Sequence, residues 1–488
     1  MNMKIDELEP QTVWRIFKEI TRIPRCSGRE RRLQNWVEEW AENKGISHLR
    51  DEVGNILLSK KADAGCEDYP VLTFQVHQDM VCEKVTESTH NFETDPLDLQ
   101  IGEGYVTAKG TSLGADNGIG IAMAMAALVD PETAGYGKLE VLMTVEEETT
   151  FRGASNVKRG FFDGKKMINL DSEEAGVIIV ESAGGCSTEY RFKATPEVPE
   201  GWVGKRLEVD GLLGGHSGVD IHLPRANAIK LISEGLTELT GYSRLRICRF
   251  EGGTRGNAIP RSANCDFLVP CTESEKLKNI FNDWSGKAKS KYDYEGGLIM
   301  ELKDRSPIES IPEGVSINII KLINDVPQGV IKFSDKIEGL VQTSSNIGII
   351  RTKDETVTIS IFSRSSENTD LETLSNELRN LGEKYGAETS QTPPSHGWST
   401  PPSTPFVKFT AQKYREVTGA EPKVTGIHGG LECAQFASLE PEIQIVSIGS
   451  TLEFPHSPRE RLQITSVPIV WNLLKAMIRD IKEVGDIT

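Results

Sequence analysis

Short apolar runs that end in acidic or histidine residues recur along the first part of the chain. In Leu139–Glu148, LEVLMTVEEE, an apolar stretch predicts a strand buried on both faces, and three glutamates follow it. Val71–His77 predicts a second buried strand, which delivers His77 and Asp79 at its C-terminal end. Lys166–Asp171 predicts a third strand that ends on an acid. Ligands of open α/β sheets bind at these strand ends, so we expect a site there.

Apolar residues at helical spacing predict helices between these strands. The first covers Pro10–Thr21. A second begins at Ser27, where SGRE fits a capping box with Glu30, and ends at Gly45. Small and apolar residues up to Asp130 predict a buried helix that follows the glycine-rich segment GTSLGADNGIG. The alternation of strands and helices predicts an α/β fold.

The pattern changes in the middle of the chain, where strands and helices with charged exposed faces are mixed. The earlier rhythm resumes with a helix at Phe406–Thr418 and a strand at Gln444–Ser450. Thr392–Pro405 is rich in proline and serine, which is typical of a crossing between domains. No sequence repeat is visible within the middle part. We therefore predict a split catalytic domain, residues 1–186 and 393–488, with an inserted α+β domain, residues 187–392.

Composition narrows the class of protein. A chain of 488 residues with 38% hydrophobic and 26% charged residues is typical of a globular protein with two or three domains. The net charge of −17 argues against nucleic-acid or anionic-membrane partners, and no apolar run approaches the roughly 18 residues of a membrane span. The eight cysteines form no CxxC pair, and the N-terminus lacks the apolar core of a signal peptide. We expect a cytoplasmic protein with reduced thiols.

The candidate chemistry lies in histidines and carboxylates at strand ends and in loops. Imidazole and carboxylate ligands suit zinc, manganese or cobalt, and three carboxylates with a bridging hydroxide would offset two divalent ions. Taken alone, His77 is more often a core histidine, and Asp116 can be a helix N-cap. The glycine-rich segment lacks the GK[ST] of a phosphate loop. The candidate set is His77, Asp79, Asp116, Glu147, Glu148, Asp171 and His456.

The order of several motifs resembles that of the aminoacyl-histidine dipeptidases, a family of cytosolic, carnosinase-like di-zinc metallopeptidases. The motifs are VHQDMV, KGTSLGADNGIG, LMTVEEE, NLDSEE, GGHSG, NAIPR, HGGLEC and PHSP. They span nearly the whole chain. The resemblance implies a zinc-exopeptidase-like catalytic domain, with a mixed sheet and helices on both faces, and an inserted lid domain.

The resemblance also implies a ligand set for two divalent metal ions, zinc first, with manganese or cobalt as alternatives. His77 and Asp171 would hold one ion. Glu148 and His456 would hold the other. Asp116 would bridge the two ions, and the peptide bond that follows it would be cis.

Catalytic and substrate-binding roles follow from the same resemblance. Asp79 would orient the His77 imidazole, and Glu147 would be the general base. The lid would supply His216 to stabilise the oxyanion. It would also supply Asn257 and Arg364 as substrate contacts.

Two departures from the family pattern affect these assignments. The family has TEEAG where this chain has Glu146–Thr150, EEETT, so the register of the glutamates decides which of them is the base. Alignment on LEVLMT and on Gly153 selects Glu147 and Glu148 and leaves Glu146 without a role. Cys82 also differs from common members. Glu432 receives no role.

The predicted function is hydrolysis of dipeptides, of the Xaa-His type such as β-alanyl-histidine, by a metallo-dipeptidase. One alternative is a metal-dependent deacylase, or a dipeptidase or tripeptidase of different specificity. A second is a non-catalytic metal-binding protein, and a dinucleotide-binding oxidoreductase is more distant because its fingerprint is absent. The expected partner is a small peptide, without nucleic acid or membrane. A homodimer and a monomer both remain open.

Overall fold

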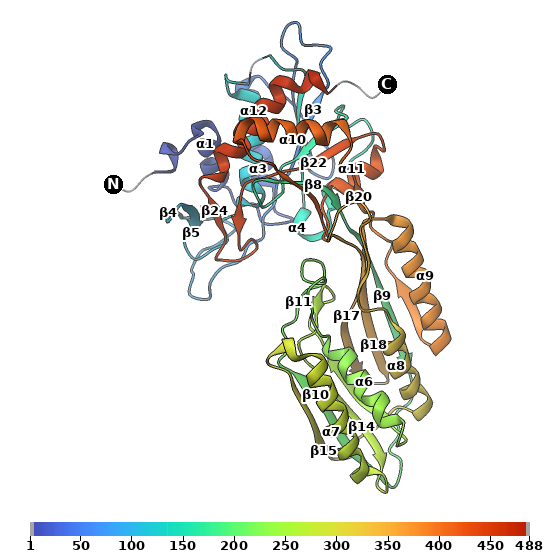
Figure 1. The fold of residues 1–488 in the computed structure, drawn as a ribbon. Coiled ribbons are helices and arrows are strands. Elements are labelled where there is room, and N and C mark those ends of the chain that lie inside the picture. The colour runs from blue at the N-terminus through green and yellow to red at the C-terminus, as the bar shows by residue number, and fades with distance from the viewer. Residues whose placement is uncertain (1–3, 134, 485–488) are drawn as a thin grey trace. The chain divides into compact units, whose positions relative to one another are not determined.

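The computed structural model describes residues 4–133 and 135–484, which form two compact units. The first unit comprises Met1–Glu181, Trp398–Gly426 and Leu431–Thr488, and the second comprises Ser182–Gly397 and Ile427–Gly430. In Figure 1 the blue and red parts of the chain belong to the first unit, and the second unit is largely green to orange. The short return of the chain at Ile427–Gly430 was not predicted.

The first unit is built on a mixed nine-stranded sheet, in which β21 pairs with β8 beside the main strand order β1-β2-β6-β3-β7-β22-β8-β20. Neighbours β6, β3, β7 and β22 run parallel. A smaller sheet has the order β23-β24-β5-β4. The strands are β1 (Ser47–Arg50), β2 (Ile56–Lys60), β3 (Leu72–His77), β4 (Leu99–Gly102), β5 (Tyr105–Ala108), β6 (Leu139–Thr144), β7 (Lys166–Asn169), β8 (Val177–Ser182), β20 (Trp398–Ser399), β21 (Lys423–Ile427), β22 (Gln444–Ser447), β23 (Leu452–Glu453) and β24 (Arg461–Gln463).

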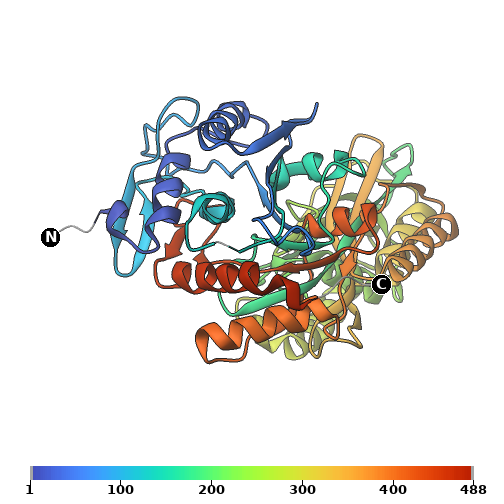
Figure 2. The ribbon, with the colours of Figure 1, turned by 90° about the horizontal axis from the view of Figure 1, so that it is seen from above.

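Helices pack on this sheet, and its central strands are buried along their whole length. Every residue of β3 and β6 is buried, as expected for strands covered on both faces. Helix α3 packs against β3 and β6, and α10 packs against β22. Helices α10 and α12, orange and red in Figure 2, lie side by side. The helices of this unit are α1 (Gln11–Ile20), α2 (Arg31–Lys44), α3 (Ala115–Val129), α4 (Glu147–Thr150), α5 (Arg152–Asn156), α10 (Pro405–Thr418), α11 (Cys433–Leu439) and α12 (Ser466–Asp480). The predicted α/β class is confirmed.

The second unit is an α+β unit with one nine-stranded sheet, of main order β15-β10-β14-β12-β17-β18-β9-β19, and with β16 beside β17. All four of its helices contribute to one hydrophobic core with the sheet. Its elements are β9 (Gly184–Lys193), β10 (Trp202–Asp210), β11 (Gly215–His216), α6 (Ala228–Thr240), β12 (Arg246–Gly252), β13 (Ala258–Ile259), β14 (Ala263–Pro270), α7 (Ser274–Lys291), β15 (Ile299–Arg305), α8 (Glu313–Asp325), β16 (Gly329–Phe333), β17 (Val341–Lys353), β18 (Thr356–Ser365), α9 (Asn368–Tyr385) and β19 (Glu388–Gln391).

The second unit contains a structural repeat that the sequence does not reveal. The chain order β10-α6-β12-β14-α7-β15 produces the strand order β15-β10-β14-β12. The chain order β9-α8-β17-β18-α9-β19 produces the equivalent order β19-β9-β18-β17. The two halves join through antiparallel pairing of β12 with β17, and the first half is inserted between β9 and α8 of the second.

The expectation of reduced thiols is wrong for one pair of cysteines. A disulfide joins Cys26 and Cys82, which are 56 residues apart in the chain. The sequence offered no signal for this pairing, because the fold brings the segment before α2 beside the segment after β3. The parallel bridge between Cys26 and Met80 shows the same proximity.

This disulfide predicts the number of titratable thiols. Alkylation of the denatured protein without reductant should modify six cysteines, and alkylation after reduction should modify all eight. Intact mass spectrometry measures the difference directly. Without reductant, the Cys26→Ser variant should have one more modified thiol than the wild type, because Cys82 loses its partner. Eight modified thiols in the unreduced wild type would contradict the pairing.

Within residues 4–133 and 135–484, none of the helices has the length and apolar character needed to span a lipid bilayer.

Candidate metal centre

The parallel strands of the first unit deliver the predicted ligands to one edge of the sheet. Because β3, β6 and β7 run in the same direction, their C-terminal ends lie together. His77 is the last residue of β3, and Asp171 lies two residues beyond β7. The glutamates follow β6, and α3 begins beside Asp116. His456 comes from the loop between β23 and β24.

Asp116 lies between the two histidines and faces each with a different oxygen. Its Oδ1 is 2.9 Å from His77 Nε2, and its Oδ2 is 3.0 Å from His456 Nε2. The same histidine nitrogens face a second carboxylate each. Asp171 Oδ1 lies 3.2 Å from His77 Nε2, and Glu148 Oε2 lies 3.0 Å from His456 Nε2. The five predicted ligands thus form two overlapping groups that share Asp116.

The peptide bond between Asp116 and Asn117 is cis, as the resemblance implied. The Asn117 side chain donates hydrogen bonds to Leu170 O, at 2.8 Å, and to Asp171 Oδ1. The segment that carries Asp116 is therefore connected to the segment that carries Asp171.

Asp79 lies on the opposite side of the His77 ring from the other carboxylates. Its Oδ1 is 3.4 Å from His77 Nδ1, and the Asp79 side chain is fully buried. It accepts hydrogen bonds from Ser27 Oγ at 2.7 Å and from the Glu147 amide at 3.0 Å. It also accepts one from the Glu148 amide at 3.3 Å. Asp79 therefore fixes both the imidazole and the segment that carries the glutamates.

The predicted capping box at Ser27 is wrong. Helix α2 begins at Arg31, and the Ser27 hydroxyl donates to Asp79 instead of accepting from a helix amide. The Glu30 carboxylate accepts from the Gly28 amide at 2.9 Å and from the Glu146 amide at 3.2 Å. Long-range partners have replaced the local capping bonds, so this motif supports the site rather than the helix.

The three consecutive glutamates lie beyond strand β6, in a turn and a short helix. Strand β6 ends at Thr144, Glu146 has a left-handed backbone with φ 53°, and Glu147 and Glu148 begin the one-turn helix α4. The Glu146 carboxylate instead pairs with Arg152 at 2.5 Å. It is Glu148 that faces His456.

The electrostatics of the cluster follow from burial and from the crowding of acids. Burial raises the pKa of Glu148 to about 7, and the charge of Asp116 adds to the effect. Burial also raises the pKa of Glu147 well above its usual range, with contributions from Asp171 and from Glu432. Two effects on the pKa of Asp116 oppose each other. Burial raises this pKa, but the hydrogen bonds from His456 and His77 lower it by more, so the pKa lies below its ordinary value. The cluster therefore favours positive charge beside Asp116.

The donor set fits divalent metal ions. Three groups have ligand atoms within 4.8 Å of one another: His77 with Asp116 and Asp171, His77 with Glu147 and Glu148, and Asp116 with Glu173 and His456. Among the described residues, the buried Oε1 of Glu148 has no hydrogen-bond partner. Two imidazoles and several carboxylates without thiolate are ligands for zinc, manganese or cobalt. An ion would also relieve the repulsion between the acids.

Two further carboxylates, Glu173 and Glu432, lie at or near the cluster and were not among the predicted site residues. Glu173 is exposed and grouped with Asp116 and His456. Its signal was its place in NLDSEE, two residues after Asp171. Glu432 is fully buried and accepts hydrogen bonds from Gln75 Nε2 and Thr144 Oγ1, both at 2.6 Å. Burial raises the pKa of Glu432 to about 8, and the charge of Asp171 adds to the effect.

His216 and Asn257 belong to the second unit and lie on adjacent short strands and turns. His216 in β11 pairs with Ala258 in β13, and the Ser217 amide donates to Asn257 O at 2.9 Å. The Asn257 residue is exposed. The amides of Gly218 and Val219 donate to His216 Nδ1, each at 3.2 Å. In a neutral imidazole the proton then resides on Nε2, which leaves that nitrogen as a donor.

Arg364 is buried in the second unit and is not a solvated surface arginine. It lies on β18 opposite Ser344 of β17, and it is 8% exposed. Burial lowers the pKa of Arg364 to about 10, and its buried Nε has no hydrogen-bond partner among the described residues. The His428 ring Nε2 lies 2.7 Å from Ser344 Oγ, and burial and the charge of Arg364 lower the pKa of His428 to about 3. His428 was not among the predicted site residues, although it lies in the motif HGGLEC.

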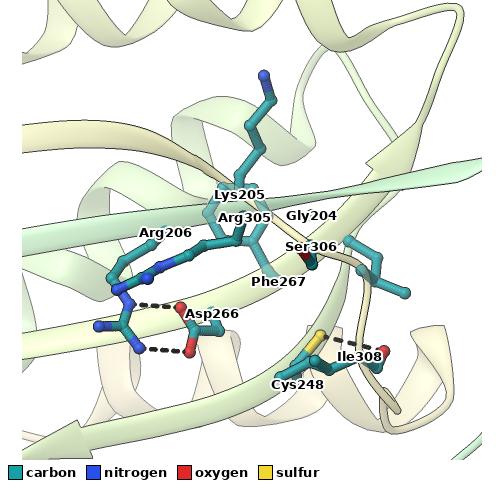
Figure 3. Close-up of a pocket in the computed structure, with 10 residues that line it drawn as sticks. Gly204, Lys205, Arg206, Cys248, Asp266, Phe267, Arg305, Ser306 and Ile308 are labelled. Carbon is teal, nitrogen blue, oxygen red and sulfur yellow. Dashed lines mark hydrogen bonds and ion pairs between the residues drawn. The ribbon is translucent and has the colours of Figure 1, made fainter.

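A cavity in the second unit, of about 270 Å³, contains none of the predicted site residues. Figure 3 shows that Arg206 points both ends of its guanidinium at Asp266, with distances of 2.5 and 2.6 Å. Lys205 also has an acidic partner, Asp304, at 2.5 Å. Two of the three cations that line this cavity are therefore paired with carboxylates, and the third is Arg305.

Comparisons with known proteins agree with the motifs. The model of Peptidase family M20/M25/M40 matches residues 73–480. The chain is 36% identical over 481 residues to the cytosol non-specific dipeptidase of Escherichia coli (strain K12), covering 98% of this chain and 99% of that protein. The crystal structure of aminoacylhistidine dipeptidase from Vibrio alginolyticus matches with a TM-score of 0.92 and 33% identity, covering 100% and 99% of the two chains.

A more distant structure, a tripeptidase from Staphylococcus aureus, matches with a TM-score of 0.57 and 14% identity over 98% of this chain and 99% of that one, and it supports the fold alone. The family match covers most of the chain, and the relative in Escherichia coli covers nearly all of it. These findings confirm the resemblance that the sequence motifs indicated. The chain belongs to Peptidase family M20/M25/M40.

Proposed function

We propose that this protein is a metal-dependent dipeptidase that hydrolyses dipeptides of the Xaa-His type, with two divalent metal ions at the carboxyl edge of the first unit's sheet. The observation that carries the proposal is the position of Asp116, whose two oxygens face two different histidines. A carboxylate so placed is suited to bridge two ions. The names of the similar proteins, a non-specific dipeptidase and an aminoacylhistidine dipeptidase, support the substrate class.

His77 and Asp171 would hold one ion, Glu148 and His456 the other, and Asp116 both. When bound, the ions would lower the pKa of water and polarise the peptide carbonyl. We choose zinc for both positions, with manganese or cobalt as alternatives, because the ligands are imidazole and carboxylate.

The residues around these ligands supply the proton transfers. Glu147 accepts a proton from the attacking water and returns it to the leaving amine nitrogen. Burial raises the pKa of Glu147 above that of an exposed glutamate, which makes its carboxylate the stronger base. Asp79 keeps the His77 ring in place with Nε2 turned toward Asp116 and Asp171.

The second unit would serve as a lid and supply the substrate contacts. His216 is suited to donate a hydrogen bond from Nε2 to the carbonyl oxygen as it becomes negative. Arg364 is a buried cation and is suited to receive the substrate's terminal carboxylate through two parallel hydrogen bonds. Asn257 is an exposed amide available to the substrate backbone.

A substrate panel tests this function. The metal-free protein is reconstituted with Zn²⁺, Mn²⁺ or Co²⁺ and offered dipeptides, tripeptides and N-acylated amino acids, with β-alanyl-histidine among the dipeptides. We expect hydrolysis of dipeptides and much slower turnover of the other two classes. Preferential hydrolysis of N-acyl amino acids would favour the deacylase alternative, and the absence of turnover with every metal would exclude the proposal.

The two-ion hypothesis predicts a stoichiometry. Elemental analysis of protein reconstituted with excess metal and then desalted should find about two divalent ions per chain, since the five ligands form two groups that share Asp116. The Asp116→Asn variant should lose affinity for both ions. A wild-type protein that saturates with one tightly bound ion would contradict the bridging role.

We place the protein in the cytoplasm, on the basis of the cytosolic relative in Escherichia coli. The disulfide between Cys26 and Cys82 opposes this placement, because disulfides are rare in reducing compartments. Alkylation of thiols in rapidly acidified cells measures the oxidation state of this pair in place. For the assembly, a homodimer and a monomer remain the two alternatives, which light scattering separates.

A further inference from the structure

A buried carboxylate, Glu460, accepts hydrogen bonds from four consecutive backbone amides. Its Oε2 accepts from the Leu113 and Gly114 amides at 2.8 and 2.9 Å. Its Oε1 accepts from the Ala115 and Asp116 amides at 2.8 and 3.3 Å. Glu460 is 2% exposed. The segment that leads to Asp116 therefore forms a cradle of N–H groups around one side chain.

The same segment is held from its carbonyl side by a buried cation, Arg25. Its Nη2 donates to Gly114 O, and its Nη1 donates to Gln78 O at 2.9 Å and to Asp79 O at 2.7 Å. Arg25 is 1% exposed. A guanidinium can bind several carbonyl groups at once because its donors lie in a fixed plane. Arg25 thus connects the segment after β3 with the segment before Asp116.

Glycine makes room for this arrangement. A Cβ atom at Gly114 would lie 2.8 Å from Arg25 Nη2, and one at Gly118 would also lie 2.8 Å from it. Gly114 has φ +64°, a left-handed conformation that glycine adopts at little cost. These two positions allow the guanidinium to approach the backbone closely. Gly114 and Gly118 of GTSLGADNGIG therefore make room for a side chain of the protein.

Together the two side chains connect three segments that carry candidate ligands. Glu460 follows His456 by four residues in PHSPRE, and it binds the amides up to Asp116. Arg25 binds the carbonyl groups next to His77 and within the Asp116 segment. A shift of Asp116 relative to either histidine would break hydrogen bonds between charged side chains and backbone, which are among the stronger ones in proteins.

We propose that Glu460 and Arg25 are positioning residues that set the affinity of the metal centre by holding Asp116 in register with His77 and His456. This inference rests on the proposed function, because it requires that Asp116 binds metal. Neither side chain touches a metal ion in this proposal. Their effect passes through the backbone of Leu113–Asp116.

The test is the Glu460→Gln variant. The amide keeps one acceptor oxygen, and its NH₂ group would face two of the four backbone N–H groups. We expect affinity for at least one of the two ions to fall about 10–100-fold, as for other residues that orient metal ligands. Isothermal titration of the metal-free protein with Zn²⁺, and separately with Mn²⁺, measures each affinity.

Glu140→Gln provides the matched control. Glu140 is also a fully buried carboxylate that accepts hydrogen bonds from backbone amides, those of Asp163 and Gly164 at 3.0 and 3.1 Å, but it lies near the start of β6, at the other end of that strand from the candidate ligands. Its metal affinities should equal those of the wild type. The Arg25→Lys variant should weaken metal binding in the same direction as Glu460→Gln, because an ammonium lacks the planar fork.

Thermal unfolding of the metal-free variants separates positioning from a purely structural role. A structural role would lower the midpoint of Glu460→Gln without changing metal affinity in the folded protein, and this result would overturn the inference. If Arg25→Lys does not fold, Glu460→Gln decides alone. A wild-type protein that binds no divalent ion would instead refute the proposed function, so the two failures are distinguishable.

Discussion

Replacing Glu147 with glutamine is expected to lower kcat by about 10²–10⁴-fold, the usual contribution of a general base. The amide cannot accept the proton of the attacking water. The candidate metal ligands His77, Asp116, Asp171, Glu148 and His456 are unchanged in this variant, so both ions should remain. Steady-state kinetics with a dipeptide, together with elemental analysis of the same preparation, measures the two properties.

The neighbouring glutamates are the controls for this variant. Glu148→Gln should weaken one ion, because Glu148 faces His456 at 3.0 Å. Glu146→Gln should have little effect on kcat, because the Glu146 carboxylate pairs with Arg152. A Glu146→Gln variant that loses activity while Glu147→Gln retains it would show that the register is displaced by one residue.

The parts of the fold that could be predicted are those where the local pattern and the tertiary environment agree. Strands β3 and β7 are buried along their whole length, and parallel pairing brings their ends together. His77 and Asp171 could therefore be placed on one edge from the sequence. The predicted end of the second helix, at Gly45, was also correct, because glycine adopts the left-handed cap that α2 requires.

The parts that could not be predicted depend on contacts between residues distant in sequence. Ser27 and Glu30 fit a local capping box, but Asp79 and the Glu146 amide bind them in the folded protein. Similarly, nothing near Glu460 in the sequence indicates that its partners are distant backbone amides. The amide of Leu113, for example, is 347 residues away in the chain. Side chains that support a site have no fixed spacing, so a motif search finds the ligands and misses their supports.

The structural repeat in the second unit illustrates a different limit. Both halves have the same order of strands and helices, but no repeated sequence pattern reveals them. Burial constrains only which positions are apolar, and many apolar residues satisfy that requirement. Topology can therefore repeat where residue identity does not, and the insertion of one half within the other further separates equivalent elements.

Replacing Arg364 with methionine is expected to reduce kcat/KM for free dipeptides by about 2–4 kcal/mol of transition-state stabilisation. Arg364 is buried, and within residues 4–133 and 135–484 no acidic side chain forms an ion pair with it. An unpaired buried charge is costly and favours an anionic ligand. A substrate carboxylate gripped there would set the distance to the scissile bond, and so would select dipeptides over longer chains.

The same dipeptide with an amidated C-terminus separates this role from a structural one. The amide offers no carboxylate, so Arg364→Met should change its hydrolysis much less than that of the free dipeptide. Arg364→Lys should give an intermediate loss, because lysine retains the charge but not the two parallel hydrogen bonds. Arg191→Met is the matched control, since Arg191 lies on the neighbouring strand β9 with its side chain half exposed. Equal losses on the free and amidated substrates would exclude Arg364 from the substrate site, because a carboxylate contact can only be lost where a carboxylate is present.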